Sequence, residues 1–129
     1  MQLRATIKGD QAIIRALQKA PRQTGEEIRR DIDFITTDIA NTAKQDHPYI
    51  DRTGNLTNSI GIVPAKEVVG GYEGVAQAVM DYAEDVEGGT EHSRAFPFMG
   101  PAKEDKYPDS EIERRIATAA MRGLRRAGL

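Results

Sequence analysis

The sequence predicts an α+β fold in which a small antiparallel β-sheet packs against a long central helix and a C-terminal helix. Residues 25–45 and 110–126 repeat apolar side chains at helical spacing, and residues 59–79 contain two alternating stretches separated by glycines. Helices and strands that are segregated along the chain, rather than alternating, are typical of the α+β class. The length of 129 residues suits a single domain spanning residues 1–129.

The N-terminal segment predicts a short strand followed by a helix. Residues 3–7 alternate weakly between apolar and polar side chains, and Gly9-Asp10 then interrupts them. Asp10 can cap the first turn of a helix, and Pro21 ends that helix because it lacks a backbone N–H. The apolar positions expected on this helix are Ile13, Ile14, Leu17 and Ala20.

The strongest helix is expected from Gly25 to Gln45. Thr24 and Glu27 have the spacing of a capping box, in which the two side chains satisfy the first free amides of a helix. A single apolar stripe follows, made of Ile28, Ile32, Ile35, Ile39 and Ala43. The helix should stop before His47-Pro48, because a proline disfavours helical geometry in the residue before it.

The middle of the chain predicts a short helix and then a hairpin. We expect the helix over Asn55–Ser59 and a strand over Ser59–Val63, which Pro64 closes or marks as an edge strand. Residues Ala65–Glu73, which include two adjacent glycines, are expected to form a flexible connection. Val75–Val79 is the returning strand.

A second capping box, Ser110 with Glu113, predicts the start of the C-terminal helix. Its apolar stripe contains Ile112, Ile116, Ala119 or Ala120, and Leu124. Gly128 suits the C-terminal cap.

Charge is unevenly distributed along the chain although the total is only −2. Residues 48–110 carry 5 basic and 11 acidic side chains, whereas residues 111–129 carry 5 basic and 2 acidic ones. The C-terminal helix is therefore either a solvated basic helix or a surface that meets an acidic face of another subunit. The chain has no cysteine, no run of signal-peptide type and no membrane-spanning run, so we expect a soluble protein made in the cytosol.

No catalytic, cofactor-binding or metal-binding residue is assigned. His47 with Asp51 has the composition of a general base or half a metal site, but a helix-end role is favoured. His92 is expected in a surface loop, and the carboxylates of residues 84–91 lack the spacing of a calcium loop. The arginines of the C-terminal helix are not interleaved with aromatics, so no stacking platform for single-stranded nucleic acid is expected. Sequence-specific reading of DNA is not expected either.

Three local patterns occur in order along the chain. They are Pro48 followed by Thr53–Ile60 (TGNLTNSI), then Asp81–Thr90 (DYAEDVEGGT), then Arg94–Ala102 (RAFPFMGPA) before a helix. Over roughly residues 9–126 the chain resembles the tail-completion family, also called neck or head–tail joining proteins, of long-tailed bacteriophages and prophages. It departs from the family pattern in the longer spacing from Pro48 to Thr53 and in the two residues, Ala95 and Phe96, before Pro97.

The resemblance implies a structural virion protein without enzymatic activity that forms a ring, hexameric in the family, at the head–tail junction. It implies four partners: other copies of the chain, a head-closure or connector protein, a tail terminator or tail-tube protein, and genomic DNA that passes through the lumen without being read. No membrane is involved, and the place of synthesis would be the cytoplasm of a bacterial host.

We expect the contact regions to be Ala65–Glu73 and Asp81–Thr90, with the C-terminal helix pairing electrostatically with the second of them. The candidate contact residues are Tyr82, Glu84, Asp85, Val86, Glu87, Phe96, Phe98, Arg122, Arg125 and Arg126. Three alternatives stay open: a tail-terminator protein of similar fold, a small hydrolase that uses His47 and Asp51, and a regulatory nucleic-acid-binding domain that uses the terminal helix.

Overall fold

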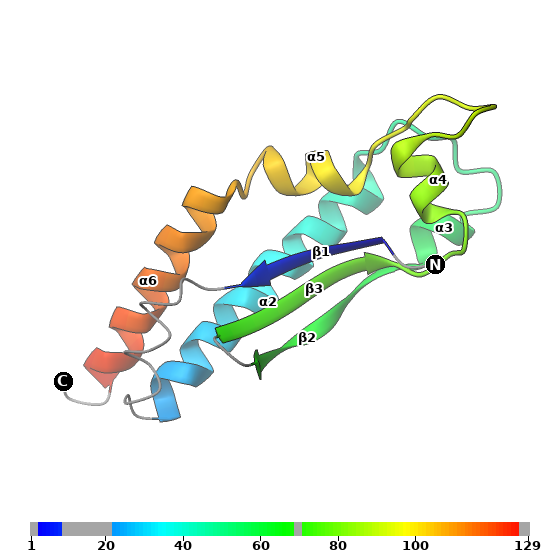
Figure 1. Ribbon diagram of the computed structural model, residues 1–129. Coiled ribbons are helices and arrows are strands. Elements are labelled where there is room, and N and C mark those ends of the chain that lie inside the picture. The colour runs from blue at the N-terminus through cyan, green and yellow to red at the C-terminus, as the bar shows by residue number, and fades with distance from the viewer. Residues whose placement is uncertain (1–2, 9–21, 69–70, 127–129) are drawn as a thin grey trace.

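The computed structural model of the protein describes residues 3–8, 22–68 and 71–126 (Figure 1). The predicted helix over residues 10–20 and the predicted cap at Gly128 lie outside these ranges. In chain order the elements are β1 (Leu3–Lys8), α2 (Arg22–Gln45), α3 (Asn55–Asn58), β2 (Ile60–Val68), β3 (Gly71–Ala78), α4 (Ala83–Gly88), α5 (Met99–Glu104) and α6 (Asp109–Arg126). The predicted α+β class is confirmed, with a long central helix and a C-terminal helix against a small antiparallel sheet.

The described sheet has three antiparallel strands in the order β1-β3-β2, so β3 is central and β2 lies at an edge. Pro64 is tolerated in β2 because an edge strand need not donate a ladder hydrogen bond on its outer side. The register shifts between Val63 and Lys66 at this point. The Ala65 amide donates instead to the Asp33 carboxylate of α2 at 2.7 Å, so the helix satisfies the backbone group that the irregularity frees.

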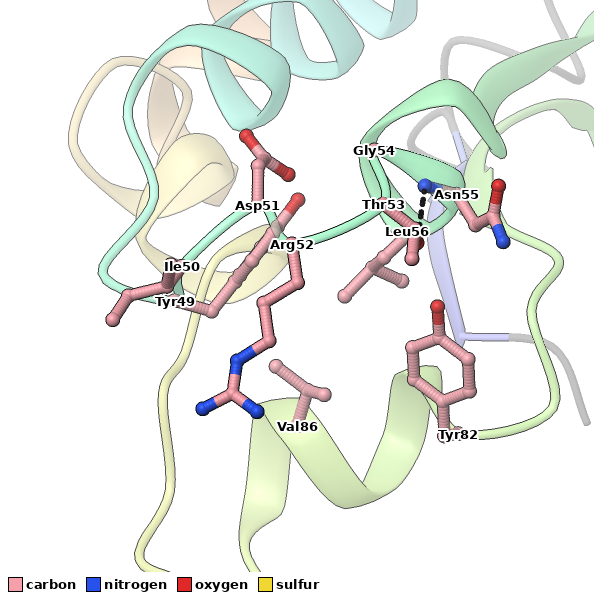
Figure 2. A pocket seen from close by; sticks show the side chains of 10 residues that line it. All are labelled: Tyr49, Ile50, Asp51, Arg52, Thr53, Gly54, Asn55, Leu56, Tyr82 and Val86. Carbon is pink, nitrogen blue, oxygen red and sulfur yellow. Dashed lines mark hydrogen bonds between the residues drawn. The ribbon is translucent and has the colours of Figure 1, made fainter.

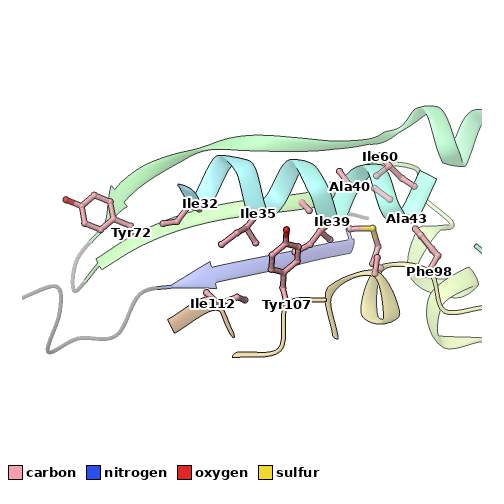
Figure 3. Packing of buried hydrophobic residues seen from close by; sticks show 14 of the residues in the cluster. Ile32, Ile35, Ile39, Ala40, Ala43, Ile60, Tyr72, Phe98, Tyr107 and Ile112 are labelled. Carbon is pink, nitrogen blue, oxygen red and sulfur yellow. The ribbon is translucent and has the colours of Figure 1, made fainter. Parts of the chain in front are cut away.

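The predicted apolar stripe of α2 forms the centre of the core. Ile28, Ile32, Ile35 and Ile39 are all fully buried, and Figure 3 shows the last three of them on the side of α2 that meets the other elements. The helix approaches β3 closely because that strand offers small residues. A Cβ atom on Gly74 would lie only 2.3 Å from Cγ2 of Ile32.

Helix α6 packs antiparallel on α2, so that the end of α6 meets the beginning of α2. A Cβ atom on Gly123 would lie 2.5 Å from Cα of Thr24, which makes this the point where a glycine lets the two backbones approach. Tyr107 lies just before the start of α6, and its hydroxyl donates a hydrogen bond to Asp38 in the second half of α2. Ile112, Ile116, Ala119 and Ala120 are buried in the same core, as their spacing predicts.

Both predicted capping boxes are wrong. Helix α2 begins at Arg22, so Thr24 lies inside it, fully buried, with its hydroxyl unpaired in the described part of the chain. Helix α6 begins at Asp109, and the Pro108 carbonyl accepts the amide of Ile112 at 3.2 Å, which leaves Ser110 inside the first turn. The capping pattern is local, whereas the packing of Gly123 of α6 against the first turn of α2 determines where the Thr24 side chain lies.

The expected flexible connection over Ala65–Glu73 is also wrong for most of its length. Strand β2 continues to Val68 and β3 begins at Gly71, so the two strands pair almost to the turn. The irregularity after Val63 lets the strand continue beyond Pro64. The predicted short helix after Thr53-Gly54 is confirmed as α3, and the predicted strands after it are confirmed in a longer form.

Candidate functional site

Two distinct surface regions lie at the two ends of α2 (Figure 1). Near Gln45, at its C-terminal end, the segment of residues 49–56 faces α4 across a cleft. Near Glu27, at its N-terminal end, the arginines of the last turns of α6 gather. The rise of an α-helix places these two ends of α2 about 27 Å apart.

The cleft has a volume of about 200 Å³ and mostly apolar walls. Figure 2 shows the side chains of Tyr82, which precedes α4, and of Val86 on α4 opposite those of Arg52 and Leu56. The predicted apolar pair of Tyr82 and Val86 thus forms one wall. Ile50 and Tyr82 at its rim are 78% and 40% exposed. The volume lies below the range of roughly 300–1,000 Å³ of small-molecule sites, and suits a single side chain better.

A chain of hydrogen bonds holds the segment that forms the other wall. Nε2 of His47 lies 2.8 Å from Oδ2 of Asp51, and Oδ1 of the same carboxylate accepts the Thr57 hydroxyl at 2.5 Å. Because Thr57 gives its one proton to Asp51, the Tyr49 hydroxyl, 2.7 Å away, donates to Thr57. The rings of His47 and Tyr49 stack with centroids 3.9 Å apart.

These contacts shift two ionisable groups in opposite directions. The Thr57 hydroxyl and, to a lesser extent, His47 lower the pKa of Asp51, because both stabilise the carboxylate. Burial raises the pKa of Tyr49. At neutral pH the Asp51 carboxylate therefore stays ionised and accepts hydrogen bonds, and the Tyr49 hydroxyl stays protonated and donates one.

The geometry does not support His47 as a general base. Its Nδ1 lies 3.1 Å from the carbonyl oxygen of Ala43, and its Nε2 faces the Asp51 carboxylate. Both ring nitrogens therefore face acceptor groups of the chain itself. His47 does not line the cleft, so it does not face a molecule bound there. The pair instead joins the end of α2 to the following loop, which agrees with the predicted helix-end role.

Glu87 links α4 to α5 within the same chain. Its carboxylate accepts the amides of Phe98, Met99 and Gly100 at 2.7, 3.0 and 2.9 Å, so it caps the start of α5. The Phe96 amide also donates to the Val86 carbonyl at 2.7 Å. The segment from α4 to α5 is thereby fixed as a single unit.

The ten predicted contact residues divide by their surroundings. Tyr82, Glu84, Asp85 and Arg125 carry no hydrogen bond or ion pair from their side chains to a described residue, and Val86 lies beside Tyr82 on the cleft wall. Phe96 is half-buried under the Arg94 guanidinium. Phe98 is in the core, 1% exposed, and packs edge-on to Tyr49. Glu87, Arg122 and Arg126 are engaged within the chain.

The partner of Arg122 and Arg126 within the chain is Glu27. This carboxylate is almost fully buried and faces three guanidinium groups: Arg30 at 3.4 Å, Arg122 at 3.4 Å, and Arg126, which is closest. A single negative charge among three positive charges leaves this end of the molecule positive. Arg125 adds a further charge that is not neutralised within the described residues.

Beside these arginines, Met121 projects from the outer face of α6. It is 53% exposed and lies on a shallow surface that Arg114, Ala117, Thr118, Arg122 and Arg125 share with it. Sequence reasoning missed Met121 because it falls off the buried stripe, and missed Ile50 and Arg52 because they belong to no periodic pattern. A search for large apolar residues off the buried stripe would have found Met121.

Two further properties concern the described residues only. Within them, no group of three or more histidine and acidic side chains is placed to hold a metal ion. None of the described helices is both long and apolar enough to cross a membrane.

Comparison with protein-family models, with curated proteins and with solved structures found no match to this chain.

Proposed function

We propose that this protein is a structural component of a bacteriophage virion, a tail-completion or neck protein that associates head to tail into a ring at the head–tail junction. Two things support the proposal. The first is the order of the three motifs that resemble the tail-completion family. The second, which carries it, is the opposite charge of two surfaces at the two ends of α2.

The charge contrast is large for a chain of small net charge. Residues 81–91 contain five acidic side chains and neither lysine nor arginine, whereas residues 114–126 contain five arginines and no acidic side chain. Only part of this charge is neutralised internally. Glu84 and Asp85 form no ion pair with a described residue, and the α6 end has more guanidinium groups than the Glu27 carboxylate can balance.

The placement of the two surfaces supports a head-to-tail assembly. Complementary patches at different places on one chain pair as two unlike surfaces, and a second copy then presents a free patch of each kind. Such contacts produce a closed ring when the rotation between copies closes and an open filament when it does not. The two surfaces therefore support head-to-tail association, the kind of contact that a ring needs.

In this role the ring would join the head-closure or connector protein to the tail terminator or tail tube, and DNA would pass through its lumen without being read. The chain would be made in the bacterial cytoplasm and reside in the virion. A tail terminator would use the same kind of assembly and is the nearest alternative. We propose no catalytic activity, because both ring nitrogens of His47 are engaged.

A charge swap tests the head-to-tail contact. Arg125→Glu and Asp85→Arg should each weaken self-association at low salt, by about 1 kcal/mol per contact or roughly fivefold, because an exposed attraction becomes a repulsion. The double variant should recover association, since each copy then offers a carboxylate at position 125 to a guanidinium at position 85 of its neighbour. Lys66→Glu, on the edge strand β2, changes the net charge as much as Arg125→Glu and should have little effect. Association is measured by sedimentation over a range of concentrations.

Failure of the double variant to recover association, while both single variants weaken it, would contradict this pairing. The position in the virion needs its own test. Electron microscopy of particles that carry a gold-labelled copy should show the label at the head–tail junction. Label at the tail tip or on the capsid would reject the neck assignment. A gene position between portal or head-closure genes and a major tail gene would support it.

A further inference from the structure

We infer that the cleft between residues 49–56 and α4 receives the Met121 side chain of a second copy of this chain. The inference rests on the proposed head-to-tail association and identifies its central apolar contact. It accounts for two features that residues 3–8, 22–68 and 71–126 leave without a partner: an open apolar cleft at one end of α2 and a projecting apolar side chain at the other.

The cleft suits a side chain from a protein. Its volume of about 200 Å³ is small, and its walls are built from Tyr49, Leu56, Tyr82 and Val86. An exposed apolar depression with a polar rim is the usual setting for an anchoring side chain in a protein–protein interface. The aromatic rings of Tyr49 and Tyr82 favour a thioether, because sulfur packs well against aromatic rings.

Met121 is the best candidate among the exposed apolar residues of the helical layer. It is 53% exposed and unbranched, so it can adapt to a shallow cleft. Phe34, 57% exposed, lies midway along α2, and the Arg115 guanidinium already lies 5.1 Å from its ring centroid. Among the described residues of the arginine end, Met121 is therefore the exposed large apolar side chain.

Charge orients the contact. Arg125 lies four residues after Met121, which places it one turn away on the same face of α6. The cleft has Asp51 on one wall, and Glu84 and Asp85 lie on α4 beside the cleft-lining Val86. Asp51 and Arg52 balance each other among the residues that line the cleft, so Glu84 and Asp85 on the neighbouring helix give its surroundings their negative charge. A methionine flanked by arginines thus meets an apolar cleft flanked by carboxylates.

The contact cannot form within a single chain. Met121 is next to Arg122, which pairs with Glu27 near the start of α2, whereas the cleft begins beyond the end of α2. The two ends are about 27 Å apart by the rise of an α-helix, far beyond the reach of a methionine side chain. Only another copy can bring the two together.

Disulfide trapping tests the inference directly, because the natural chain has no cysteine. Chains carrying Met121→Cys are mixed with longer, tagged chains carrying Tyr82→Cys and are oxidised mildly, so that the mixed dimer has its own mobility on a gel. A disulfide requires the two Cβ atoms to approach to roughly 4 Å. The matched control replaces Met121→Cys by Glu113→Cys, an exposed position two turns earlier on the same helix.

We expect the mixed dimer with Met121→Cys to form at least ten times faster than with Glu113→Cys. In the cysteine-free chain, Met121→Asp should weaken association about tenfold while Met121→Leu leaves it within twofold. If the chain associates in sedimentation but the two mixtures cross-link equally slowly, the cleft contact is wrong and the head-to-tail ring remains. If the chain neither associates nor cross-links, both are wrong.

Discussion

Replacement of Gly74 by alanine should destabilise the protein, although alanine favours folding at many glycine positions. A Cβ atom at Gly74 would lie 2.3 Å from Cγ2 of Ile32 and 3.2 Å from Cγ2 of Thr36, where carbon atoms normally approach to about 3.5–4.0 Å. Ile32 cannot easily turn away, because a β-branched side chain in a helix has one strongly preferred rotamer. The clash can therefore be relieved only if α2 moves away from β3. That movement would disturb the packing of the core, in which Ile32 is fully buried.

The magnitude follows from two opposing terms. Overpacking of this kind costs about 1–3 kcal/mol, and the reduced entropy of the unfolded chain returns about 0.4–1 kcal/mol. We expect a net loss of about 1–2 kcal/mol in the free energy of unfolding. At about 4 °C per kcal/mol for a domain of this size, the melting temperature should fall by roughly 4–8 °C.

Gly61 provides a matched control in the neighbouring strand. A Cβ atom there would meet nothing within 4 Å, and neither glycine has a positive φ. Gly61→Ala should therefore be neutral or stabilise the fold by up to about 1 kcal/mol. Urea unfolding followed by far-ultraviolet circular dichroism measures both variants. Equal stability of the two would refute the close packing of α2 on β3.

Two further predictions concern polar contacts. Burial and the Asp38 carboxylate raise the pKa of Tyr107 to about 12 from 10.0, so its stabilising contribution is complete below pH 10 and is lost as the pH rises toward 12. Tyr107→Phe should cost about 1 kcal/mol at pH 8, and urea unfolding should show this difference shrinking between pH 10 and 12; a constant difference would contradict it. Glu87→Ala should cost about 0.5–2 kcal/mol and lower hydrogen-exchange protection in the first turn of α5, whereas Glu84→Ala should not; equal effects of the two would reject the capping role.

The sequence predicts a helix or strand of this protein wherever the burial of one face makes apolar residues recur at a regular spacing. The stripe from Ile28 to Ala43 identifies α2, and the side chains of the stripe are all buried. The stripe of α6 and the paired strands are found in the same way. Each of these signals arises because one face of a helix or strand is buried away from water. The apolar residues on that face therefore recur with the period of the helix or strand.

Sequence reasoning was less successful where a residue has two plausible local roles. Thr24 and Glu27 match a capping box, yet Thr24 packs under Gly123 and Glu27 pairs with arginines that lie 95 and 99 residues away. Pro64 predicts either the end of a strand or an edge strand, and it lies in the edge strand β2; the sequence did not predict that the Ala65 amide donates to Asp33 of α2. A local pattern cannot distinguish these outcomes, because the competing partner is distant in the sequence.

For the candidate site, the sequence by itself determined its components: the apolar pair of Tyr82 and Val86, the surplus of carboxylates in residues 81–91 and the arginines of residues 114–126. Only the tertiary structure decided how they are used. In the structure, Phe98 lies in the core, the Glu87 carboxylate caps α5, and the Glu27 carboxylate pairs with the arginines of α6. Within the described residues, the cleft and the Met121 side chain stay exposed at opposite ends of α2. The physical reason is that the spacing of buried residues follows from the local geometry of a helix or strand and can be read from the sequence. Which of many similar charged side chains pair with one another depends on which of them the packing around α2 brings together.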